Sequence, residues 1–204
     1  MVKAVIFDLG QVIVAFDLQR GYAALASRCP LPPEEIPKRI AATELVSRFE
    51  MGRVSPQEFV RRFCGLLELQ VSYAEFCELW SSIFLPHTLI PESLLAGLRR
   101  NYRLLLLSNT NAIHFAMIRQ RYPLLRHFHE RVLSYKIGVL KPAPEIYRQA
   151  IAKAGCRPEE CFYTDDTPLY VEAARQLGMD AVQFHSLPQL ETELQVRAVS
   201  WQED

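Results

Sequence analysis

The chain has 204 residues, of which 50% are hydrophobic and 23% are charged, as is usual for a globular protein. Lysine and arginine together number 23, and so do aspartate and glutamate, which gives a formal net charge of zero. This balance argues against the strongly basic surfaces that bind nucleic acids or membranes, so neither is expected as a partner. The length suits one α/β domain with an insertion, or two small domains.

The cysteines and the apolar runs limit the cellular setting. The five cysteines are scattered and have no Cys-x-x-Cys spacing, so neither a disulfide framework nor a structural zinc site is expected. The first apolar run is interrupted by Asp8 and is too short for a signal peptide. No stretch approaches the ~20 apolar residues of a transmembrane helix. These features predict a cytoplasmic protein with reduced thiols.

The first part of the chain combines one strand with a long helical block. Residues 2–9 are apolar and β-branched, which predicts a buried strand. Residues 17–85 follow a helical period without strand signals. Two Ser-x-x-Glu sequences, at residues 55–58 and 72–75, predict capping boxes at the starts of helices inside this block.

Strands alternate with helices in the rest of the chain. Strands are predicted at residues 103–107, 131–134, 161–164 and 181–184. Helices are predicted at residues 91–100, 143–154 and 169–177, in a segment ending at residue 121, and from residue 187 onward. This alternation predicts an α/β fold, a doubly wound Rossmann-like parallel sheet with helices on both faces. We expect this core to comprise residues 1–14 and 87–204, with residues 15–86 inserted as a helical cap.

Polar residues follow three of the predicted strands. Asp8 follows the first, the sequence Ser-Asn-Thr at residues 108–110 follows the second, and Asp165 and Asp166 follow a later one. Ligands of open parallel sheets bind outside the carboxyl ends of the strands. We therefore expect these segments to meet at one edge of the sheet. The helical block begins just after the first segment, where it could cover the site as a lid.

Each segment suits part of a phosphoryl-transfer site. Ser108 and Asn109 precede a helix, whose free N–H groups favour a phosphate oxygen. The ammonium of Lys141, between a leucine and a proline, would neutralise a phosphoryl group. The adjacent carboxylates Asp165 and Asp166 repel each other, and Mg²⁺ prefers such oxygen ligands. Taken singly, these residues could equally be helix caps, turn residues or a solvated lysine.

The order of these residues is more informative than any one of them. An aspartate can attack phosphorus and divide hydrolysis into two easier steps through a covalent intermediate. Asp8 would be this nucleophile and would share the metal ion with the later acidic pair. Lys141 would offset the negative charge between the carboxylate and the incoming phosphate.

Four segments resemble the signature motifs of the haloacid dehalogenase superfamily, in the right order and over nearly the whole chain. These segments are Phe7-Asp8-Leu9-Gly10, Leu107-Ser108-Asn109, Lys141-Pro142 and Asp165-Asp166. The resemblance implies a four-helix cap and a Mg²⁺-dependent phosphatase. It implies that the catalytic residues are Asp8, Ser108 and Lys141, that the substrate-binding residues are Ser108, Asn109 and Lys141, and that the metal ligands are Asp8, Gly10 through its backbone carbonyl, Asp165 and Asp166.

Two further segments, residues 7–13 and 49–55, resemble a subgroup of small sugar-phosphate phosphatases that includes an α-glucose-1-phosphate phosphatase. This resemblance implies a small phosphorylated metabolite, such as a sugar phosphate, as substrate. Pocket contacts could come from Arg20, Glu50, Arg53 or Trp80 in the cap. The sequence favours no particular oligomeric state.

The chain departs from the family pattern at the position of the general acid. Gly10 stands where most phosphatases of the family carry a second aspartate, and Leu169 stands where many have another acidic residue. General acid–base catalysis is typically worth ~10²–10⁴-fold. The departure therefore predicts a slow enzyme, or one in which Asp17 or the pair Asp165 and Asp166 substitutes.

Two other functions remain open. A 2-haloacid dehalogenase also uses an aspartate nucleophile without the second aspartate, but it needs no metal, whereas Asp165 and Asp166 favour one. A domain that has lost efficient turnover could instead bind a phosphorylated ligand or a protein partner. The retained Asp8 and Lys141 argue against such a binding domain, because binding alone requires no nucleophile. Tyr163 is expected to be only a core residue of its strand.

Overall fold

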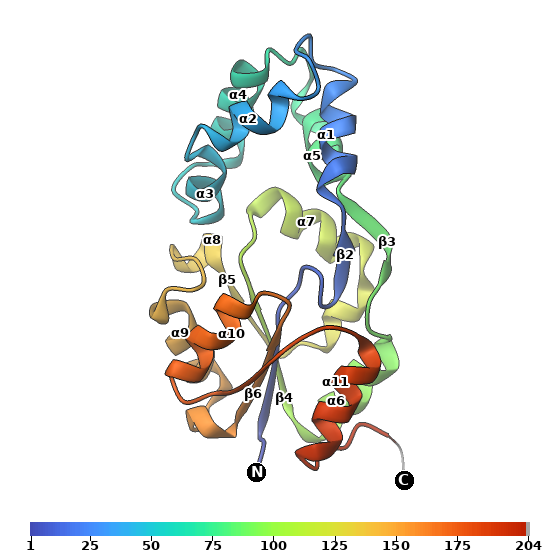
Figure 1. The fold of residues 1–204 in the computed structure, drawn as a ribbon, viewed down its shortest axis with the longest axis vertical. Coiled ribbons are helices and arrows are strands. Elements are labelled where there is room, and N and C mark those ends of the chain that lie inside the picture. Colours follow the sequence, from blue (N-terminus) through green and yellow to red (C-terminus); the bar gives the residue numbers. More distant parts are fainter. Residues whose placement is uncertain (203–204) are drawn as a thin grey trace.

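The computed structural model describes residues 1–202, and a parallel sheet forms the centre of its larger part (Figure 1). Within these residues the main sheet has five strands in the order β5-β4-β1-β6-β7, all paired in parallel. The strands are β1 (Ala4–Phe7), β4 (Arg103–Ser108), β5 (Glu130–Leu133), β6 (Cys161–Asp165) and β7 (Asp180–Gln183). The predicted α/β doubly wound core is thereby confirmed.

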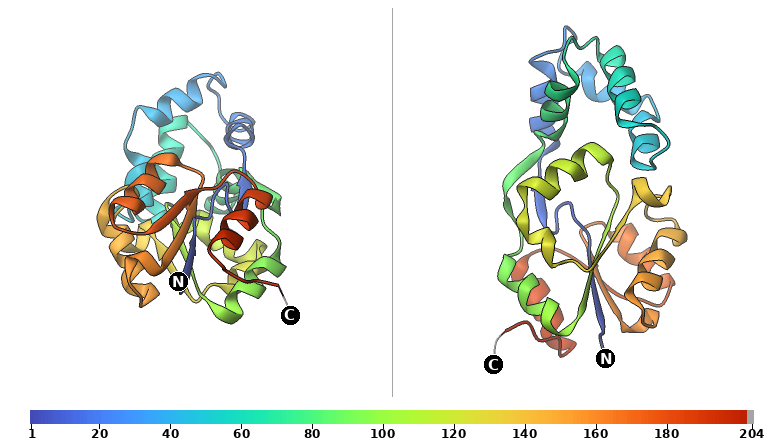
Figure 2. Two further views of the ribbon diagram at one scale, coloured as in Figure 1. Left: turned by 60° about the horizontal axis from the view of Figure 1, so that its bottom comes forward. Right: turned by 180° about the vertical axis from the view of Figure 1, so that it is seen from behind.

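Helices cover both faces of this sheet (Figure 2). Along β1, Val5 and Phe7 face one apolar cluster and Ala4 and Ile6 face the other, as the two-residue period of a strand requires. The first cluster includes side chains of α6 (Glu92–Asn101), α7 (Ala112–Arg121), the 3-10 turn η1 (Pro123–His127) and α11 (Leu187–Val196). The second includes α9 (Pro144–Ala154) and α10 (Pro168–Gln176). Short elements complete this part: α8 (Ser134–Ile137) and η2 (Pro158–Glu160).

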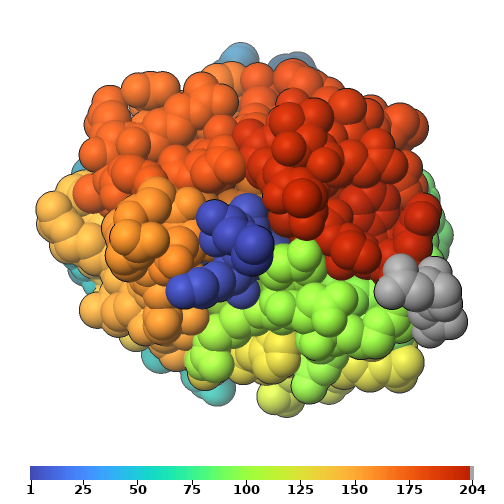
Figure 3. All heavy atoms as spheres, turned by 90° about the horizontal axis from the view of Figure 1, so that it is seen from below, coloured from blue at the N-terminus to red at the C-terminus, as the bar shows by residue number. Residues whose placement is uncertain are grey.

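The remaining helices gather at one end of the molecule, beyond the carboxyl ends of the strands (Figure 1). They are α1 (Leu18–Ala26), α2 (Glu35–Ala41), α3 (Leu45–Glu50), α4 (Pro56–Leu67) and α5 (Tyr73–Ser81). Their buried side chains form an apolar cluster of their own, which Ile113 of α7 joins. We therefore propose residues 15–86 as a cap domain that rests on the core of residues 1–14 and 87–204. The opposite face shows the N-terminal residues surrounded by segments of the core (Figure 3).

Two antiparallel strands join the helical block to the core. They are β2 (Val14–Phe16) and β3 (Phe84–Thr88), with Val14 opposite Thr88 and Phe16 opposite Phe84. The predicted helical pattern of residues 17–85 is wrong at its end, where Phe84 and Leu85 belong to β3, and neither β2 nor β3 was predicted. Three residues of β2 are too few to show a period, and β3 owes its conformation to a partner about seventy positions away in the chain.

The two predicted capping boxes differ in outcome. Ser72 and Glu75 form the complete box at the start of α5. At the start of α4, the Ser55 hydroxyl accepts the bond from the Glu58 N–H at 3.2 Å. The Glu58 carboxylate does not return to the cap, because it binds the guanidinium groups of Arg61 and Arg62 on the next turn. In the part of the chain described, no helix is both long and apolar enough to cross a bilayer.

Two glycines within helices are expected to respond oppositely to alanine. A Cβ at Gly97 in α6 would lie 1.8 Å from the backbone oxygen of Trp201, so Gly97→Ala should displace the C-terminal segment and cost about 1–3 kcal/mol. A Cβ at Gly65 in α4 meets nothing within 4 Å, so Gly65→Ala should stabilise the helix by about 0.5–1 kcal/mol. Urea unfolding midpoints measure both, and equal effects of the two substitutions would contradict the close approach at Gly97.

Candidate active site

The candidate site lies where the strand order of the sheet reverses. β1 is the first strand in the chain and lies between β4 and β6. Asp8 comes directly after β1, Ser108 ends β4 and Asp165 ends β6. Such a switch point leaves a crevice at the carboxyl ends of the strands, where open α/β sheets bind ligands. The structure thus brings three of the predicted site segments to one edge of the sheet.

Lys141 joins these segments through its ammonium group. Its Nζ atom lies 2.7 Å from Oδ1 of Asp8 and 2.6 Å from Oδ2 of Asp165, and it donates to the Leu107 carbonyl at 3.3 Å. Lys141 is 3% exposed and Asp165 is fully buried. The ammonium therefore lies between two carboxylates inside the protein and offsets part of their charge, in a place where charges interact much more strongly than in water.

Asn109 holds the loop that carries Lys141. The backbone N–H of Lys141 donates to Oδ1 of Asn109 at 2.8 Å, and Nδ2 of Asn109 donates to the Lys141 carbonyl at 3.1 Å. This double contact fixes the backbone of Lys141 against the end of β4. The Asn109 side chain is thus engaged in positioning the lysine. The Ser108 hydroxyl, 2% exposed, donates to the Asn109 carbonyl at 3.3 Å and lines the cavity beside it.

Two tyrosines complete the surroundings of Lys141. The Tyr163 hydroxyl donates to Oδ2 of Asp165 and lies 3.4 Å from the ammonium nitrogen. The ring of Tyr170 lies under this ammonium, 4.8 Å away at its centroid, which is a cation–π distance. The expectation that Tyr163 is only a core residue overlooks its hydroxyl. The signal was present in the sequence, because Tyr163 and Asp165 are two positions apart on one strand and therefore share a face.

The charges of the site shift the pKa values of its groups. Burial raises the pKa of Asp8 to about 7, and the charge of Asp165 adds to this rise while Lys141 opposes it. Burial alone would lower the pKa of Lys141, but Asp8 and Asp165 reverse that effect and raise it. The site thus holds its lysine charged and carries more acidic groups than one ammonium neutralises.

Three carboxylates of the site could hold a cation. Oxygens of Asp8, Asp165 and Asp166 all lie within 4.8 Å of one another, close to the ~4 Å between opposite ligands of Mg²⁺. Asp166 is half-buried, and its pKa is raised by burial and by the charge of Asp165. Oδ1 of Asp165 is held by the N–H of Thr167 at 2.9 Å. An all-oxygen donor set with surplus negative charge fits a hard divalent cation.

Gly10 is packed against an aromatic ring. It pairs with Val14, and a Cβ at Gly10 would lie 2.8 Å from Cε1 of Phe16. The space beside residue 10, where the family pattern leads one to expect an aspartate side chain, is therefore filled by Phe16. Asp17, proposed from the sequence as a substitute acid, is exposed and caps α1 by accepting a bond from the N–H of Gln19 at 2.8 Å.

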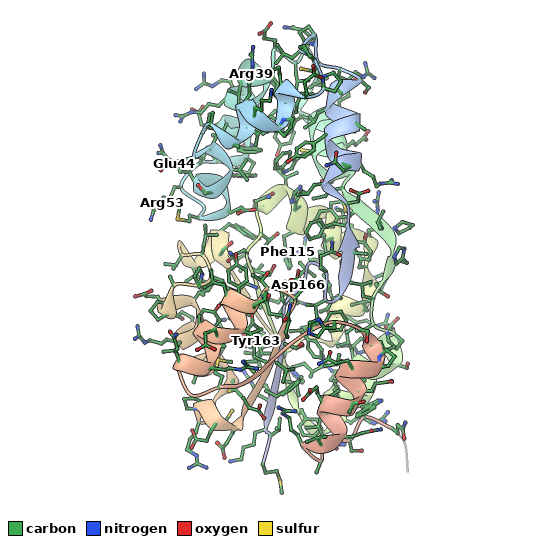
Figure 4. The ribbon with its side chains drawn as sticks, viewed as in Figure 1. Arg39, Glu44, Arg53, Phe115, Tyr163 and Asp166 are labelled. Carbon is green, nitrogen blue, oxygen red and sulfur yellow. The ribbon has the colours of Figure 1, made fainter. Side chains whose placement is uncertain are left out.

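The four cap residues suggested as pocket contacts separate into two groups. Glu50 and Trp80 line a cavity of about 310 Å³ that also contacts Ser108 and Asn109. Arg20 lines a different cavity, between α5 and α7. Arg53 is exposed at the lower edge of the helical block, whereas Tyr163 and Asp166 lie near the upper end of the sheet (Figure 4).

Comparison with known proteins agrees with this geometry. A family model described as haloacid dehalogenase-like hydrolase matches residues 2–178. The chain belongs to this family. The predicted family membership is therefore confirmed, and the two acidic segments and the lysine of this haloacid dehalogenase-like hydrolase lie within the matched region.

Relatives of this hydrolase include named phosphatases. A D-ribitol-5-phosphate phosphatase from Bacteroides thetaiotaomicron is 27% identical over 189 residues, which cover 90% of this chain and 92% of the relative. A solved haloacid dehalogenase family enzyme from the same organism, in complex with magnesium and inorganic phosphate, is 26% identical with a TM-score of 0.82, covering 92% and 96% of the two chains. An L-2-haloacid dehalogenase from Xanthobacter autotrophicus is 20% identical with a TM-score of 0.62, covering 100% and 90%, and shares the fold.

Removal of the Lys141 charge is expected to destabilise the fold. Lys141→Met leaves the carboxylates of Asp8 and Asp165 buried without a counter-charge, which should cost about 3–5 kcal/mol of unfolding free energy. Lys141→Met combined with Asp165→Asn should recover part of this loss. Urea unfolding at neutral pH measures both variants, with Lys136→Met on the exposed side of α8 as control. A Lys141→Met variant as stable as the wild-type protein would contradict this account of the charges.

Proposed function

We propose that this hydrolase is a Mg²⁺-dependent phosphatase that cleaves small phosphate monoesters through an aspartyl-phosphate on Asp8. The observation that carries the proposal is the Lys141 ammonium between Asp8 and Asp165, with Ser108 at the end of β4, the strand beside β1. The relative named as a D-ribitol-5-phosphate phosphatase and the related structure with magnesium and phosphate support it. They make sugar and sugar-alcohol phosphates the first compounds to test.

The chain's own residues divide the reaction between them. Ser108 and Lys141 bind oxygens of the phosphoryl group, with Asn109 fixing the lysine. The Asp8 carboxylate attacks phosphorus and the ester oxygen leaves with its electron pair as an alkoxide, which takes a proton from water to become the alcohol, and Asp8 is left phosphorylated. Water then hydrolyses this acyl phosphate, releases inorganic phosphate and restores the carboxylate.

The acidic groups would hold the metal ion. Asp8, Asp165 and Asp166 would supply carboxylate oxygens, and Gly10 would supply its backbone carbonyl. Bound Mg²⁺ would offset the negative charge between phosphate and carboxylates, a charge that one lysine only partly neutralises. The same carboxylates argue against the 2-haloacid dehalogenase alternative, because they would repel a haloacid carboxylate if no cation were bound.

The leaving alcohol would depart without help from residue 10. Gly10 has no acid, and the ring of Phe16 fills the adjacent space. Asp17 is occupied as a helix cap on an exposed surface. The rate should therefore depend strongly on how well the alkoxide or phenoxide carries negative charge.

Phosphate release from a panel of esters tests the proposed reaction. Mg²⁺ should support release from p-nitrophenyl phosphate and from hexose and pentitol phosphates, EDTA should abolish it, and Asp8→Asn should reduce it to background because the amide is not a nucleophile. Asp17→Asn is the matched control, since asparagine caps a helix about as well as aspartate and Asp17 lies outside the proposed machinery. Equal release by wild-type and Asp8→Asn proteins would disprove the mechanism, and binding without release would favour the binding-domain alternative.

An aspartate introduced at residue 10 should make the rate depend less on the acidity of the leaving group. Gly10→Asp combined with Phe16→Leu creates both the carboxylate and the space for it. We expect kcat for alkyl phosphates to rise about tenfold or more, within the ~10²–10⁴-fold range of general acid catalysis, and kcat for p-nitrophenyl phosphate to change little. Phe16→Leu alone is the control. A similar gain for both ester types, or none for alkyl esters, would contradict the role assigned to Gly10.

A further inference from the structure

The cavity that leads from the candidate site into the helical block is largely apolar. Its floor is formed by Leu9 and Gly10 after β1, by Ser108 at the end of β4 and by Asn109 after it. Its walls come from the cap and its connections, and most of the side chains there are aliphatic or aromatic, among them Phe16, Leu25, Ile40, Trp80 and Ile83. At about 310 Å³ it is at the lower end of the ~300–1,000 Å³ that ligand pockets usually enclose. A phosphate held at the floor would direct the rest of its ester into this space.

His114 lines the wall of the cavity but offers a ligand no free polar atom. Nδ1 of His114 lies 3.1 Å from Nδ2 of Asn111, and its Nε2 lies 3.0 Å from the carbonyl of Trp80. Burial lowers the pKa of His114 to about 4, so the ring is neutral near pH 7. A neutral ring with one nitrogen accepting and the other donating satisfies both contacts.

Glu50 is different, because its charge has no partner. Its carboxylate has no hydrogen bond or ion pair within residues 1–202, although it lines the cavity. Burial is the cause that raises the pKa of Glu50 to about 7, with no nearby cation to oppose it. Arg48 and Arg53, the cations closest to it in sequence, are exposed. A half-buried carboxylate in apolar surroundings is costly unless something pairs with it.

On the basis of the proposed phosphatase activity, we infer that the site takes phosphate monoesters of an apolar alcohol that bears a protonated amine, and that this amine pairs with Glu50. The apolar walls would contact the carbon skeleton, and the ammonium would supply the missing counter-charge. A polyol phosphate fits less well. Its several hydroxyls would lose water and find few partners in walls made mainly of aliphatic and aromatic side chains. The preference would therefore differ from that named for the Bacteroides relative.

Three phenyl phosphates of similar leaving-group acidity test this inference. They carry 2-aminoethyl, n-propyl or 2-hydroxyethyl at the para position. Differences in KM among them therefore reflect contacts of the para substituent in the cavity, because the phenoxide leaves about equally well from each. We expect KM for the aminoethyl ester to be about tenfold or more below that of the propyl ester, and the hydroxyethyl ester to show no such gain. Among alkyl esters, cyclohexylmethyl phosphate should have a lower KM than ribitol 5-phosphate.

Substitution of Glu50 tests whether its carboxylate causes the preference for the aminoethyl ester. Glu50→Gln, which keeps the size of the side chain, should bring the KM ratio of the aminoethyl and propyl esters close to one. Glu44→Gln is the matched control, because Glu44 is exposed on the same part of the cap and does not line the cavity (Figure 4). It should keep the wild-type ratio. Urea midpoints of both variants show whether they are folded.

The outcome separates this inference from the proposed function. Phosphate release that favours ribitol 5-phosphate, equal KM values for the aminoethyl and propyl esters, or an unchanged ratio in Glu50→Gln would each overturn the inference and leave the phosphatase intact. If no ester is cleaved above the Asp8→Asn background, the proposed function fails. Calorimetric binding of the corresponding benzylphosphonates, with and without the amine, then still decides the inference, which requires that wild type and Glu44→Gln bind the amine more tightly and that Glu50→Gln does not.

Discussion

The buried ammonium of Lys141 between Asp8 and Asp165 is the interaction on which the site depends. Lys141 is 133 positions from Asp8 in the chain, and its ammonium connects the ends of two neighbouring strands, β1 and β6. Two carboxylates this close would repel each other strongly without it, and burial increases the repulsion. Asn109 holds the lysine backbone and the hydroxyl of Tyr163 holds Asp165, so polar groups on three segments maintain one arrangement of charge. The remaining surplus of negative charge is what makes the site suitable for a divalent cation.

The segment that leads into the cap shapes the chemistry next to this cluster. Phe16 ends β2, packs edge-on against Phe84 of β3 at 6.2 Å between ring centroids, and fills the space beside Gly10. A side chain at residue 10 and this aromatic contact compete for the same volume. In this chain the aromatic contact occupies the volume. It stabilises the connection between cap and core and leaves no room for an acidic side chain at residue 10.

The cap is positioned by contacts that differ in kind. Ile113 of α7 packs into the aromatic cluster of the cap. At the other side, Gly52 approaches the core so closely that a Cβ would lie 2.1 Å from the carbonyl oxygen of Tyr135. Its φ of +66° is also a conformation that side chains with a Cβ rarely adopt. Glu50, two residues before Gly52, lines the cavity that also contacts Ser108 and Asn109.

The sequence by itself determined the strand and helix alternation, the parallel sheet, the family and the residues at the strand ends, because apolar periodicity and chain order carry that information. The two-residue spacing of Tyr163 and Asp165 on one strand also places them on one face, although Tyr163 was expected to be only a core residue. The strands β2 and β3, the occupation of the Glu58 carboxylate by Arg61 and Arg62, and the conflict between Gly10 and Phe16 were decided by the tertiary structure. Each depends on which groups from separate segments compete for one volume or one hydrogen bond, and a local pattern does not record that competition.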